Sequence, residues 1–513
     1  MQRDVDTVSS RQPLAAASVT RVQFGTAEAV DQWARYRPTS VAAYVSGTPW
    51  TYAELNGLAA ATAAKVAAFA SDQQRVAVAC GSKLPLLAAI LGVLRTGRSV
   101  VVVNTGLAED IIRINLRDAA VETLMHDERH RHLGALVSSS ATMPTRALTG
   151  TSIPPLVRRG PSDEWGVLYS SGTTGIPKGI VRSHESIVTE LLGWCLELGL
   201  TRHSRFYVGR PIYYGGGLVL ALATLLVGGA AILNDHELGG SLEEIWTDYQ
   251  RTLAVAPVDF AFFIPDQLRS FLRNDIGHRP PSARTILTMG QSITGAEKQQ
   301  VVEAFGCEIV ESWGNTESLG TITDPEDVRL RPDSIGRPFL TDELSVVDDE
   351  CRPVRAFELG RLAGSESAGF LQYCNRPTET AHAKRESLIL SEDIGYVDEN
   401  GFFYVKGRLQ DGVVLPNGST VFVQQLETEL RALPMVQDCC VIASSHAGGE
   451  VGLLVALVGA SPQPEGVLED VVRRQLSTSG VASMEIRILG ELPRVPSGKV
   501  DRLAIQKGFD YAA

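Results

Sequence analysis

Apolar positions follow two different periods along the first third of the chain. Short apolar runs at 75–79 and 99–103 are typical of buried strands. The alanine-rich stretch 59–70, which precedes these runs, is typical of a helix. Thr51, with Glu54 three residues later, forms a sequence pattern that begins helices. Strands and helices in this rhythm predict a parallel sheet that is covered by helices.

The same rhythm continues from residue 165 to residue 310. A short strand at 167–169 is followed by a loop of Ser, Gly and Thr and by a helix near 185–198. Two further strands, 285–289 and 308–311, end in polar turns that contain glycine. Ligands of open α/β sheets bind at the carboxyl ends of the strands, so we expect the chemistry of this protein in these turns.

The pattern becomes richer in strands after about residue 340. Apolar strand patterns occur at 344–347, 370–373 and 402–405, and the last hundred residues have strands and a helix of their own. Such a length is sufficient for a separate small domain. We therefore predict an α/β fold with two domains, a large one at 1–409 made of helix-covered sheets with a β-rich portion, and a small α+β one at 410–513.

Composition and charge narrow the classes of partner. The chain has 47 Lys and Arg against 59 Asp and Glu, a net charge of −12, which disfavours nucleic acid as a partner. The most apolar stretch, 217–233, is interrupted by Gly228 and Gly229 and is shorter than a membrane span. It predicts a buried helix up to Val227, a turn and a buried strand. Seven scattered cysteines and a polar N-terminus without a signal pattern favour a cytoplasmic protein without a membrane span.

The strongest chemical signal is the glycine-rich segment 169–179, YSSGTTGIPKG. Its glycines permit backbone turns in which successive N–H groups converge on an anion, and its hydroxyls and lysine add further donors. The segment lacks the Gly-Lys-Ser/Thr ending of the common ATPase loop. It predicts a phosphate-binding loop whose ligand groups come from Ser170, Ser171, Gly172, Thr173, Thr174, Gly175 and Lys178.

This loop closely resembles the phosphate loop of the adenylate-forming superfamily, which includes acyl- and aryl-CoA ligases, adenylation domains of nonribosomal peptide synthetases and luciferase-like enzymes. Further segments resemble motifs of that superfamily in the same order, and the resemblance covers about residues 25–505. These segments are ESWGNTE at 311–317, SEDIG at 391–395, Gly407-Arg408 with Asp411, and PRVPSGK at 493–499.

The resemblance implies an enzyme that uses ATP and Mg²⁺ to convert a carboxylic acid into an acyl-AMP. It then transfers the acyl group to a thiol of CoA or of an acyl or peptidyl carrier protein. The small C-terminal domain is implied to be a mobile lid. A remote alternative is an inactive homologue that only binds nucleotide. The presence of the motif residues, above all Lys178, Glu317 and Lys499, argues against it.

The resemblance also assigns roles to individual residues. Lys499 is implied to reach the acyl carboxylate and the bridging phosphate oxygen, Thr316 the α-phosphate, and Glu317 the Mg²⁺ ion, which favours carboxylate and phosphate oxygens. Asp393 and Arg408 are implied to bind the ribose hydroxyls. The nucleotide site is completed by Trp313 against the adenine and by Gly290, Gln291, Glu311 and Ser312.

The tyrosine segment 211–218, PIYYGGGL, departs from the superfamily pattern, because many members have a histidine there. Flat rings beside bare backbone suit a thin planar ligand, so we expect a small aromatic acid such as a hydroxy- or aminobenzoate. An aliphatic acid in the same slot is the alternative. The predicted pocket residues are Tyr213, Tyr214, Gly215 and Gly216, with apolar surface from Phe260, Phe262 and Phe263.

Two other departures leave questions open. The segment lacks the aspartate that adenylation domains use for an α-amino group, although Asp235 could face one. The hinge stretch 407–422 is one residue longer before Gly418 and has Val414 where many members have lysine. The acceptor therefore stays open between CoA, a carrier protein and an amine or alcohol that would yield an amide or ester.

Overall fold

The structure is a computed structural model that covers most of the chain. Its description applies to residues 25–70, 74–147, 154–170, 177–234, 242–273, 283–317, 319–366, 369–415, 419–445, 451–460, 466–481, 483–494 and 500–510. Among these residues, no helix has the length and apolar character that a membrane crossing requires.

A seven-stranded sheet contains the first predicted strands and the glycine-rich segment. Its core strands are parallel, and their side chains are buried on both faces, as expected for a sheet with helices on each side. Its order is β18 (Gln372–Tyr373), β8 (Gly179–Ser183), β7 (Glu164–Tyr169), β4 (Ser99–Val102), β3 (Arg75–Ala79), β5 (Thr123–His126) and β6 (Ser139–Thr142).

A nine-stranded sheet carries the segments that follow the glycine-rich region. Strands β1, β10, β9, β11, β12 and β13 are all parallel to their neighbours, and antiparallel strands lie at both edges. Its order is β15 (Arg337–Pro338), β14 (Gly320–Ile322), β13 (Glu308–Gly314), β12 (Thr285–Met289), β11 (Phe260–Phe263), β9 (Arg205–Val208), β10 (Ala230–Leu233), β1 (Val41–Val45) and β2 (Thr48–Thr51).

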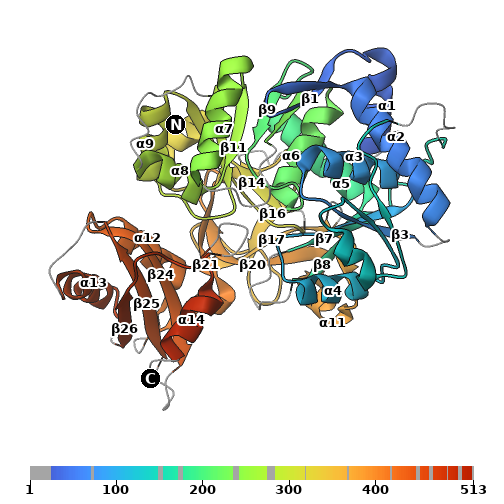
Figure 1. The fold of residues 1–513 in the computed structure, drawn as a ribbon. Coiled ribbons are helices and arrows are strands. Elements are labelled where there is room, and N and C mark those ends of the chain that lie inside the picture. The colour runs from blue at the N-terminus through green and yellow to red at the C-terminus, as the bar shows by residue number, and fades with distance from the viewer. Residues whose placement is uncertain are drawn as a thin grey trace, which may run out of the picture.

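Helices fill the space between the two sheets and form the main core (Figure 1). Thr51 and Glu54 cap the second helix as predicted, each side chain bonded to the backbone of the other. A Cβ on Gly92 would lie 2.6 Å from the carbonyl oxygen of Ala59, so glycine permits the close packing of two of these helices. The inner helices are α1 (Thr26–Tyr36), α2 (Tyr52–Phe69), α3 (Lys83–Arg95), α5 (His184–Glu197) and α6 (Gly215–Leu226).

Other helices cover the outer faces, which gives five layers. One outer face of the seven-stranded sheet packs against α4 (Glu109–Asp118) and the short helix η1 (Arg131–Leu136). The outer face of the nine-stranded sheet has a second aromatic core. It is formed with α7 (Leu242–Val255), α8 (Pro265–Arg273), α9 (Gly295–Phe305) and α10 (Pro325–Leu330).

A smaller antiparallel sheet supplies the β-rich portion. Its strands are β16 (Leu344–Val347), β17 (Gly360–Ser365), β19 (Lys384–Arg385), β20 (Leu388–Val397) and β21 (Phe403–Arg408), and α11 (Pro377–Ala383) precedes β19. The predicted strand at 370–373 is shorter than expected, because only its last two residues pair, as β18.

The chain after Arg408 forms a unit around its own core (Figure 1, orange to red). We call its three-stranded sheet and the helices on it the C-terminal unit. It consists of η3 (Leu409–Asp411), β22 (Gly412–Val414), β23 (Thr420–Phe422), α12 (Val423–Arg431), β24 (Val436–Ser445), β25 (Val451–Gly459), α13 (Val467–Thr478), β26 (Met484–Ile488) and α14 (Arg502–Asp510).

The structure corrects the sequence prediction at the glycine-rich segment. We expected a strand, a loop and then a helix, but β8 lies between the loop and α5 and pairs antiparallel with β7. The segment GIVRS has only five residues, so its pattern of apolar positions could not distinguish a strand from the first turn of the following helix. Strands β7 and β8 are thus neighbouring antiparallel strands, and Ser170 N, just after β7, donates to Lys178 O, just before β8, at 3.1 Å.

A buried ion pair joins α9 to β13 and gives a stability prediction. Lys298 Nζ lies 2.6 Å from Glu311 Oε2, and the side chains are 0% and 8% exposed. Burial raises the pKa of Glu311, and Lys298 opposes this rise. Removal of one partner leaves an uncompensated buried charge, which costs about 3–5 kcal/mol.

We expect Lys298→Met to lower the thermal stability of the protein by roughly this amount, measured by calorimetry. The double variant Lys298→Met with Glu311→Gln is the control and should recover most of the loss, because no charge is left unpaired. A single variant as stable as the wild type would show that the pair is not buried as described.

Candidate active site

The candidate site lies where four parallel strands end together. Strands β9, β11, β12 and β13 are neighbours in the nine-stranded sheet and run in one direction, so their carboxyl ends share one edge. The segments that follow these strands are the tyrosine segment, the start of α8, the Gly290 turn and the turn at 314–319. The sequence predicted three of these four segments as parts of the site.

The two tyrosines of the predicted acyl pocket occupy different environments. The ring of Tyr213 is buried, and Tyr214 is half-buried with its hydroxyl accepting a hydrogen bond from Asn104 Nδ2 at 3.1 Å. Their ring centroids are 4.5 Å apart. Tyr214 is the N-cap of α6 and no side chain caps this helix, so the first N–H groups of α6, at Gly215 and Gly216, lack a side-chain acceptor.

Gly216, at the start of α6, lies close to the ends of β11 and β12. A Cβ placed on Gly216 would lie 3.2 Å from Met289 Sδ and 3.7 Å from the ring of Phe262. The glycine therefore permits the close approach of α6 to these two strand ends.

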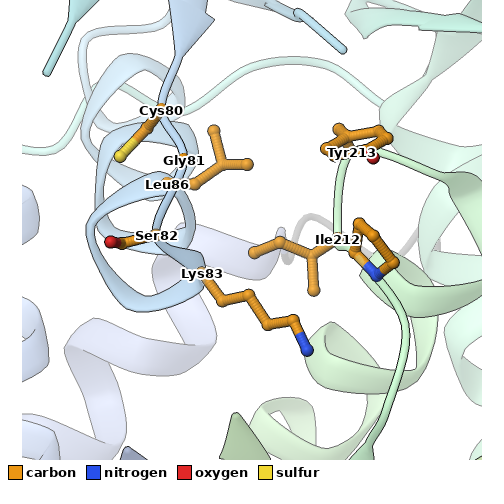
Figure 2. A pocket seen from close by; sticks show the side chains of 8 residues that line it. Cys80, Gly81, Ser82, Lys83, Leu86, Ile212 and Tyr213 are labelled. Carbon is orange, nitrogen blue, oxygen red and sulfur yellow. The ribbon is translucent and has the colours of Figure 1, made fainter. Parts of the chain in front are cut away.

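A buried lysine, Lys83, lies next to the tyrosine segment. Lys83, at the start of α3, donates from Nζ to Val208 O at 2.8 Å and to the side-chain oxygen of Asn234. It thereby ties α3 to the ends of β9 and β10. Figure 2 shows the small cavity that remains between the start of α3, where Cys80 and Ser82 lie, and Tyr213.

Arg210 is a cation beside Tyr214 that the sequence analysis missed. It follows β9 directly, and its guanidinium carbon lies 5.6 Å from the centroid of the Tyr214 ring. Burial lowers the pKa of Arg210, with Tyr214, Tyr213 and Asp266 opposing the shift. Among the described residues, no carboxylate forms an ion pair with it within 4.0 Å. A partly buried cation of this kind is available to an anion or hydrogen-bond acceptor on a ligand.

The turn after β13 presents Thr316 and Glu317. Asn315 closes the turn, because its backbone N–H donates to Leu319 O at 3.1 Å and its side chain accepts from Leu319 N at 3.0 Å. The buried side chain of Arg182, from β8, donates to Thr316 O at 3.1 Å. The hairpin of the other sheet thus fixes the turn in place.

Tyr373 links this turn to Lys178, at the end of the predicted phosphate loop. Its hydroxyl donates to Glu317 Oε1 at 2.6 Å, and Lys178 Nζ lies 5.3 Å from the centroid of its ring. Tyr373 reaches this position because β18 pairs with β8, where Tyr373 lies opposite Ile180. No Lys or Arg of the described chain pairs with Glu317, so its carboxylate can hold a cation from solution.

Trp313, Asp393 and Arg408 come together as the sequence predicted. Trp313 Nε1 donates to Asp393 Oδ2 at 3.2 Å, and Arg408 Nε lies 3.7 Å from Asp393 Oδ1. Asp393 and Arg408 face each other across the pairing of β20 with β21. Burial raises the pKa of Asp393, while Arg408 and the hydrogen bond from Trp313 lower it.

Other predicted residues use their side chains inside the protein. The carboxylate of Glu311 pairs with Lys298, and the hydroxyl of Ser312 donates to Thr321 O at 2.8 Å. Gln291 Nε2 donates to Asp266 Oδ2 at 2.8 Å, and its carbonyl accepts from Asp266 N.

Several predicted residues fall outside the described part of the chain. They are the loop residues Ser171, Gly172, Thr173, Thr174 and Gly175, as well as Asp235 and Lys499. Their predicted roles stay predictions. The described ends of the loop, Ser170 and Lys178, lie at the hairpin of β7 and β8.

Comparison with known proteins gives a consistent result. A family model described as AMP-binding enzyme matches residues 30–373. The chain is 26% identical to a 2-succinylbenzoate–CoA ligase of Listeria innocua over 339 residues, 66% of this chain and 68% of the relative. It is 23% identical to a long-chain-fatty-acid–CoA ligase of Mycobacterium tuberculosis over 481 residues, which are 90% of this chain and 93% of the relative.

A solved structure shares the fold over almost the whole chain. It is the o-succinylbenzoate CoA synthetase of Bacillus subtilis in complex with an acyl-adenylate intermediate. The TM-score is 0.82 at 21% sequence identity, and the match covers 93% of this chain and 97% of that one.

Proposed function

The chain belongs to the family of AMP-binding enzymes and is an AMP-forming ligase, and we propose that it activates a small aromatic acid with a hydrogen-bond acceptor on its ring. The acid is joined to AMP from ATP, and the acyl group then passes to a thiol of CoA or of a carrier protein. The observation that carries the choice of acid is Arg210, whose guanidinium lies over the Tyr214 ring and forms no ion pair with a carboxylate of the described residues.

The reaction has two balanced steps. An oxygen of the acid carboxylate forms a bond to the α-phosphorus of ATP, the bond to the β-phosphate oxygen breaks, and pyrophosphate leaves. The thiol sulfur then bonds to the acyl carbon, the bond from that carbon to the AMP oxygen breaks, and the thiol proton goes to solvent. Both steps bring anions together, so the site must supply positive charge and hold the groups in line.

The phosphates of ATP bind at the hairpin of β7 and β8 in this proposal. Backbone N–H groups and hydroxyls of the segment 170–175 and the amine of Lys178 would surround them. Glu317, whose carboxylate is held by Tyr373 and has no cationic partner among the described residues, would bind Mg²⁺. When bound, Mg²⁺ neutralises phosphate charge. Thr316, in the same turn, faces the α-phosphate.

The ribose of ATP binds at Asp393 in this proposal. A carboxylate only accepts hydrogen bonds, so it suits two hydroxyl donors. Arg408 and Trp313 hold this carboxylate in place. The adenine would then lie near Trp313 and the Gly290 turn, where Gly290 has a φ of +91° that favours glycine.

We expect Asp393→Asn to weaken adenosine binding about ten- to a hundredfold, because hydrogen bonds to a charged group contribute roughly 1.5–3 kcal/mol. Titration calorimetry with adenosine measures this. Glu392→Gln is the matched control, since Glu392 is a neighbouring carboxylate that pairs with Arg361. Equal affinity of Asp393→Asn and wild type would contradict the assignment.

The same site predicts a dependence on pH. The protonated form of Asp393 loses acceptor capacity, so adenosine affinity should fall as the pH falls. Because burial raises the pKa of Asp393, the fall should begin at a higher pH than for an ordinary aspartate. A constant affinity between pH 8 and pH 4 would show that the carboxylate does not bind the nucleoside.

Lys499 is proposed as the cation for the first step, on the basis of the PRVPSGK segment. Lys499→Ala should lower the rate of ATP–pyrophosphate exchange about 10²–10³-fold, the usual effect of losing one preorganised donor. ATP affinity should stay within a few-fold. Lys507→Ala, which changes an exposed lysine on α14, is the control. Near-normal exchange in Lys499→Ala would refute this role.

The acid would lie near the start of α6 in this proposal, with its ring beside Tyr214 and Arg210. Arg210 has five donors and no acceptor, so it favours a ring hydroxyl or carboxylate, whose oxygens accept, over a ring amine. Of the hydroxy- and aminobenzoates that the sequence suggested, we therefore propose the hydroxybenzoates.

A long aliphatic acid is the second candidate, because the fatty-acid ligase of M. tuberculosis matches 90% of this chain. Arg210 disfavours such an acid, because no carboxylate of the described residues pairs with it and an alkyl chain buried against the guanidinium would supply no acceptor for its charge. The acceptor of the acyl group is a thiol in this proposal. An amide or ester product would instead identify an amine or an alcohol as the acceptor.

We expect ATP–pyrophosphate exchange to favour a hydroxybenzoate over benzoate, the matching aminobenzoate and C6–C12 fatty acids by at least about tenfold in kcat/KM, which is roughly 1.4 kcal/mol. In Arg210→Met this preference should shrink to within about threefold. Arg202→Met, which changes an exposed arginine, is the control. The proposal is wrong if a fatty acid is the best substrate or if Arg210→Met slows all acids equally.

A further inference from the structure

One arginine of the C-terminal unit joins this unit to the edge of the site. Arg494 Nη2 lies 2.6 Å from Asp438 Oδ2 on β24, and its Nη1 contacts Asp266 at the start of α8. The side chain of Arg494 is 32% exposed and each aspartate is 14% exposed. We call Arg494, Asp266 and Asp438 the interdomain bridge.

Residues on the two sides of Lys499 in the sequence are paired with each other, and one of them is Arg494 of the interdomain bridge. Arg494 and Val500 pair as an antiparallel bridge, and Asp501 N donates to Pro493 O at 2.8 Å. Lys499 directly precedes Val500 in the sequence. The pairing of the described residues on the two sides of Lys499 therefore involves Arg494, which also contacts α8.

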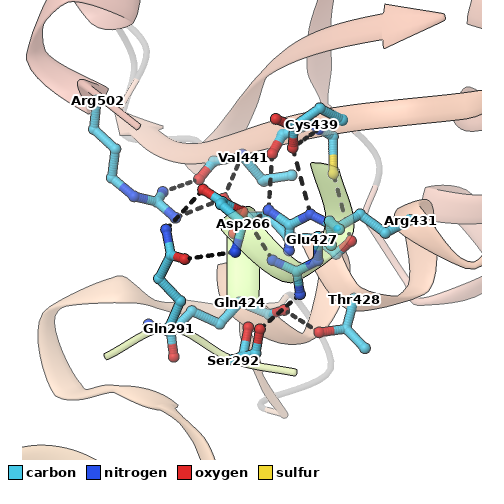
Figure 3. A network of polar contacts seen from close by, with 12 residues as sticks. Asp266, Gln291, Ser292, Gln424, Glu427, Thr428, Arg431, Cys439, Val441 and Arg502 are labelled. Carbon is cyan, nitrogen blue, oxygen red and sulfur yellow. Dashed lines mark hydrogen bonds and ion pairs between the residues drawn. The ribbon is translucent and has the colours of Figure 1, made fainter. Parts of the chain in front are cut away.

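On the other side, the bridge reaches the predicted nucleotide segment. Asp266 accepts from Arg269 Nη1 at 2.9 Å and exchanges two hydrogen bonds with Gln291, which follows Gly290 at the end of β12. Arg269 also pairs with Glu297 at 2.6 Å. Asp266 is thus held by several polar contacts at the start of α8, which follows β11. Figure 3 shows Asp266 and Gln291 within this polar network.

The partner of Arg494 within the C-terminal unit is equally well held. Asp438 lies 3.6 Å from Arg431 Nε, and Arg431 pairs with Glu427 of α12, which also contacts Arg502. A second contact runs parallel to the bridge, because Arg273 of α8 donates to Gln437 O at 3.5 Å. Figure 3 shows Glu427, Arg431 and Arg502 as parts of one polar network.

We propose that Arg494 is a positioning residue that sets the C-terminal unit against the ends of β11 and β12 during the first step of the proposed reaction. The inference rests on the proposed function. An arginine with two carboxylates in reach fixes direction as well as distance, because its donors form a planar fork. A partly exposed ion pair is screened by salt and can open, which suits a unit that must also move.

Arg494→Gln tests the proposal, with Arg474→Gln as control. Arg474 is an exposed arginine on α13 of the same unit, and its Nε donates only to Asp470 O four residues earlier. In Arg494→Gln we expect kcat of ATP–pyrophosphate exchange to fall at least tenfold, with KM for ATP and for the acid within threefold and an unchanged melting temperature. Asp438→Asn should do the same.

Asp266→Asn distinguishes a positioning role of Arg494 from a general loss of structure. Because Asp266 also holds Gln291, this variant should lower kcat and raise KM for ATP. Its effect on kcat should combine with that of Arg494→Gln less than additively, since both remove one contact. Full additivity, or an unchanged kcat in Arg494→Gln, would overturn the proposal.

A measurement without substrate keeps the test independent of the reaction. Small-angle scattering of the ligand-free protein should give a larger radius of gyration for Arg494→Gln than for the wild type and Arg474→Gln. Equal radii for the three proteins would refute the bridge. If the wild type exchanged pyrophosphate with no acid, the proposed function would fail, while the scattering result would still decide the bridge.

Discussion

The parallel pairing of β9, β11, β12 and β13 is the constraint on which the rest of the structure depends. Because these strands run in one direction, four segments that are far apart in the sequence end at one edge. Each strand is four to seven residues long, and its apolar side chains are buried on both faces. Helices on both sides of the sheet make this possible. A change of direction in one strand would send its turn to the opposite edge.

Polar groups inside the scaffold and polar groups at the edge of the site differ in how completely they are paired. Buried groups that hold the scaffold have partners, as Lys298 with Glu311 and Arg182 with Glu190 do. Groups at the edge of the site are only partly matched, as Arg210 and the carboxylate of Glu317 are. A buried charge without a partner is costly, so a ligand that supplies the partner gains from binding there. The charges of these site groups therefore indicate which complementary groups a ligand would carry.

The sequence predicted the alternation of strands and helices apart from β8, because periodicity is a local signal, and it brought Trp313, Asp393 and Arg408 into one group that the structure also shows. It could not find Tyr373, which meets Glu317 only because β18 pairs with β8 across almost two hundred residues. Arg210 and Asp266 were missed for the same reason, since their positions depend on neighbouring strands. Glu311 and Ser312 were assigned to the nucleotide by motif, yet their side chains are taken by Lys298 and Thr321, since successive side chains of a strand point to opposite faces.

The central claim is that the acid carboxylate attacks the α-phosphorus of ATP. An acid labelled with ¹⁸O in both carboxylate oxygens tests it most directly, with the reaction run to completion in the presence of a thiol acceptor. The account predicts one ¹⁸O in the phosphate of AMP and none in pyrophosphate, measured by mass spectrometry, because the oxygen that joins acid and phosphorus leaves with AMP. Label in inorganic phosphate together with ADP, or AMP that carries no label, would contradict it.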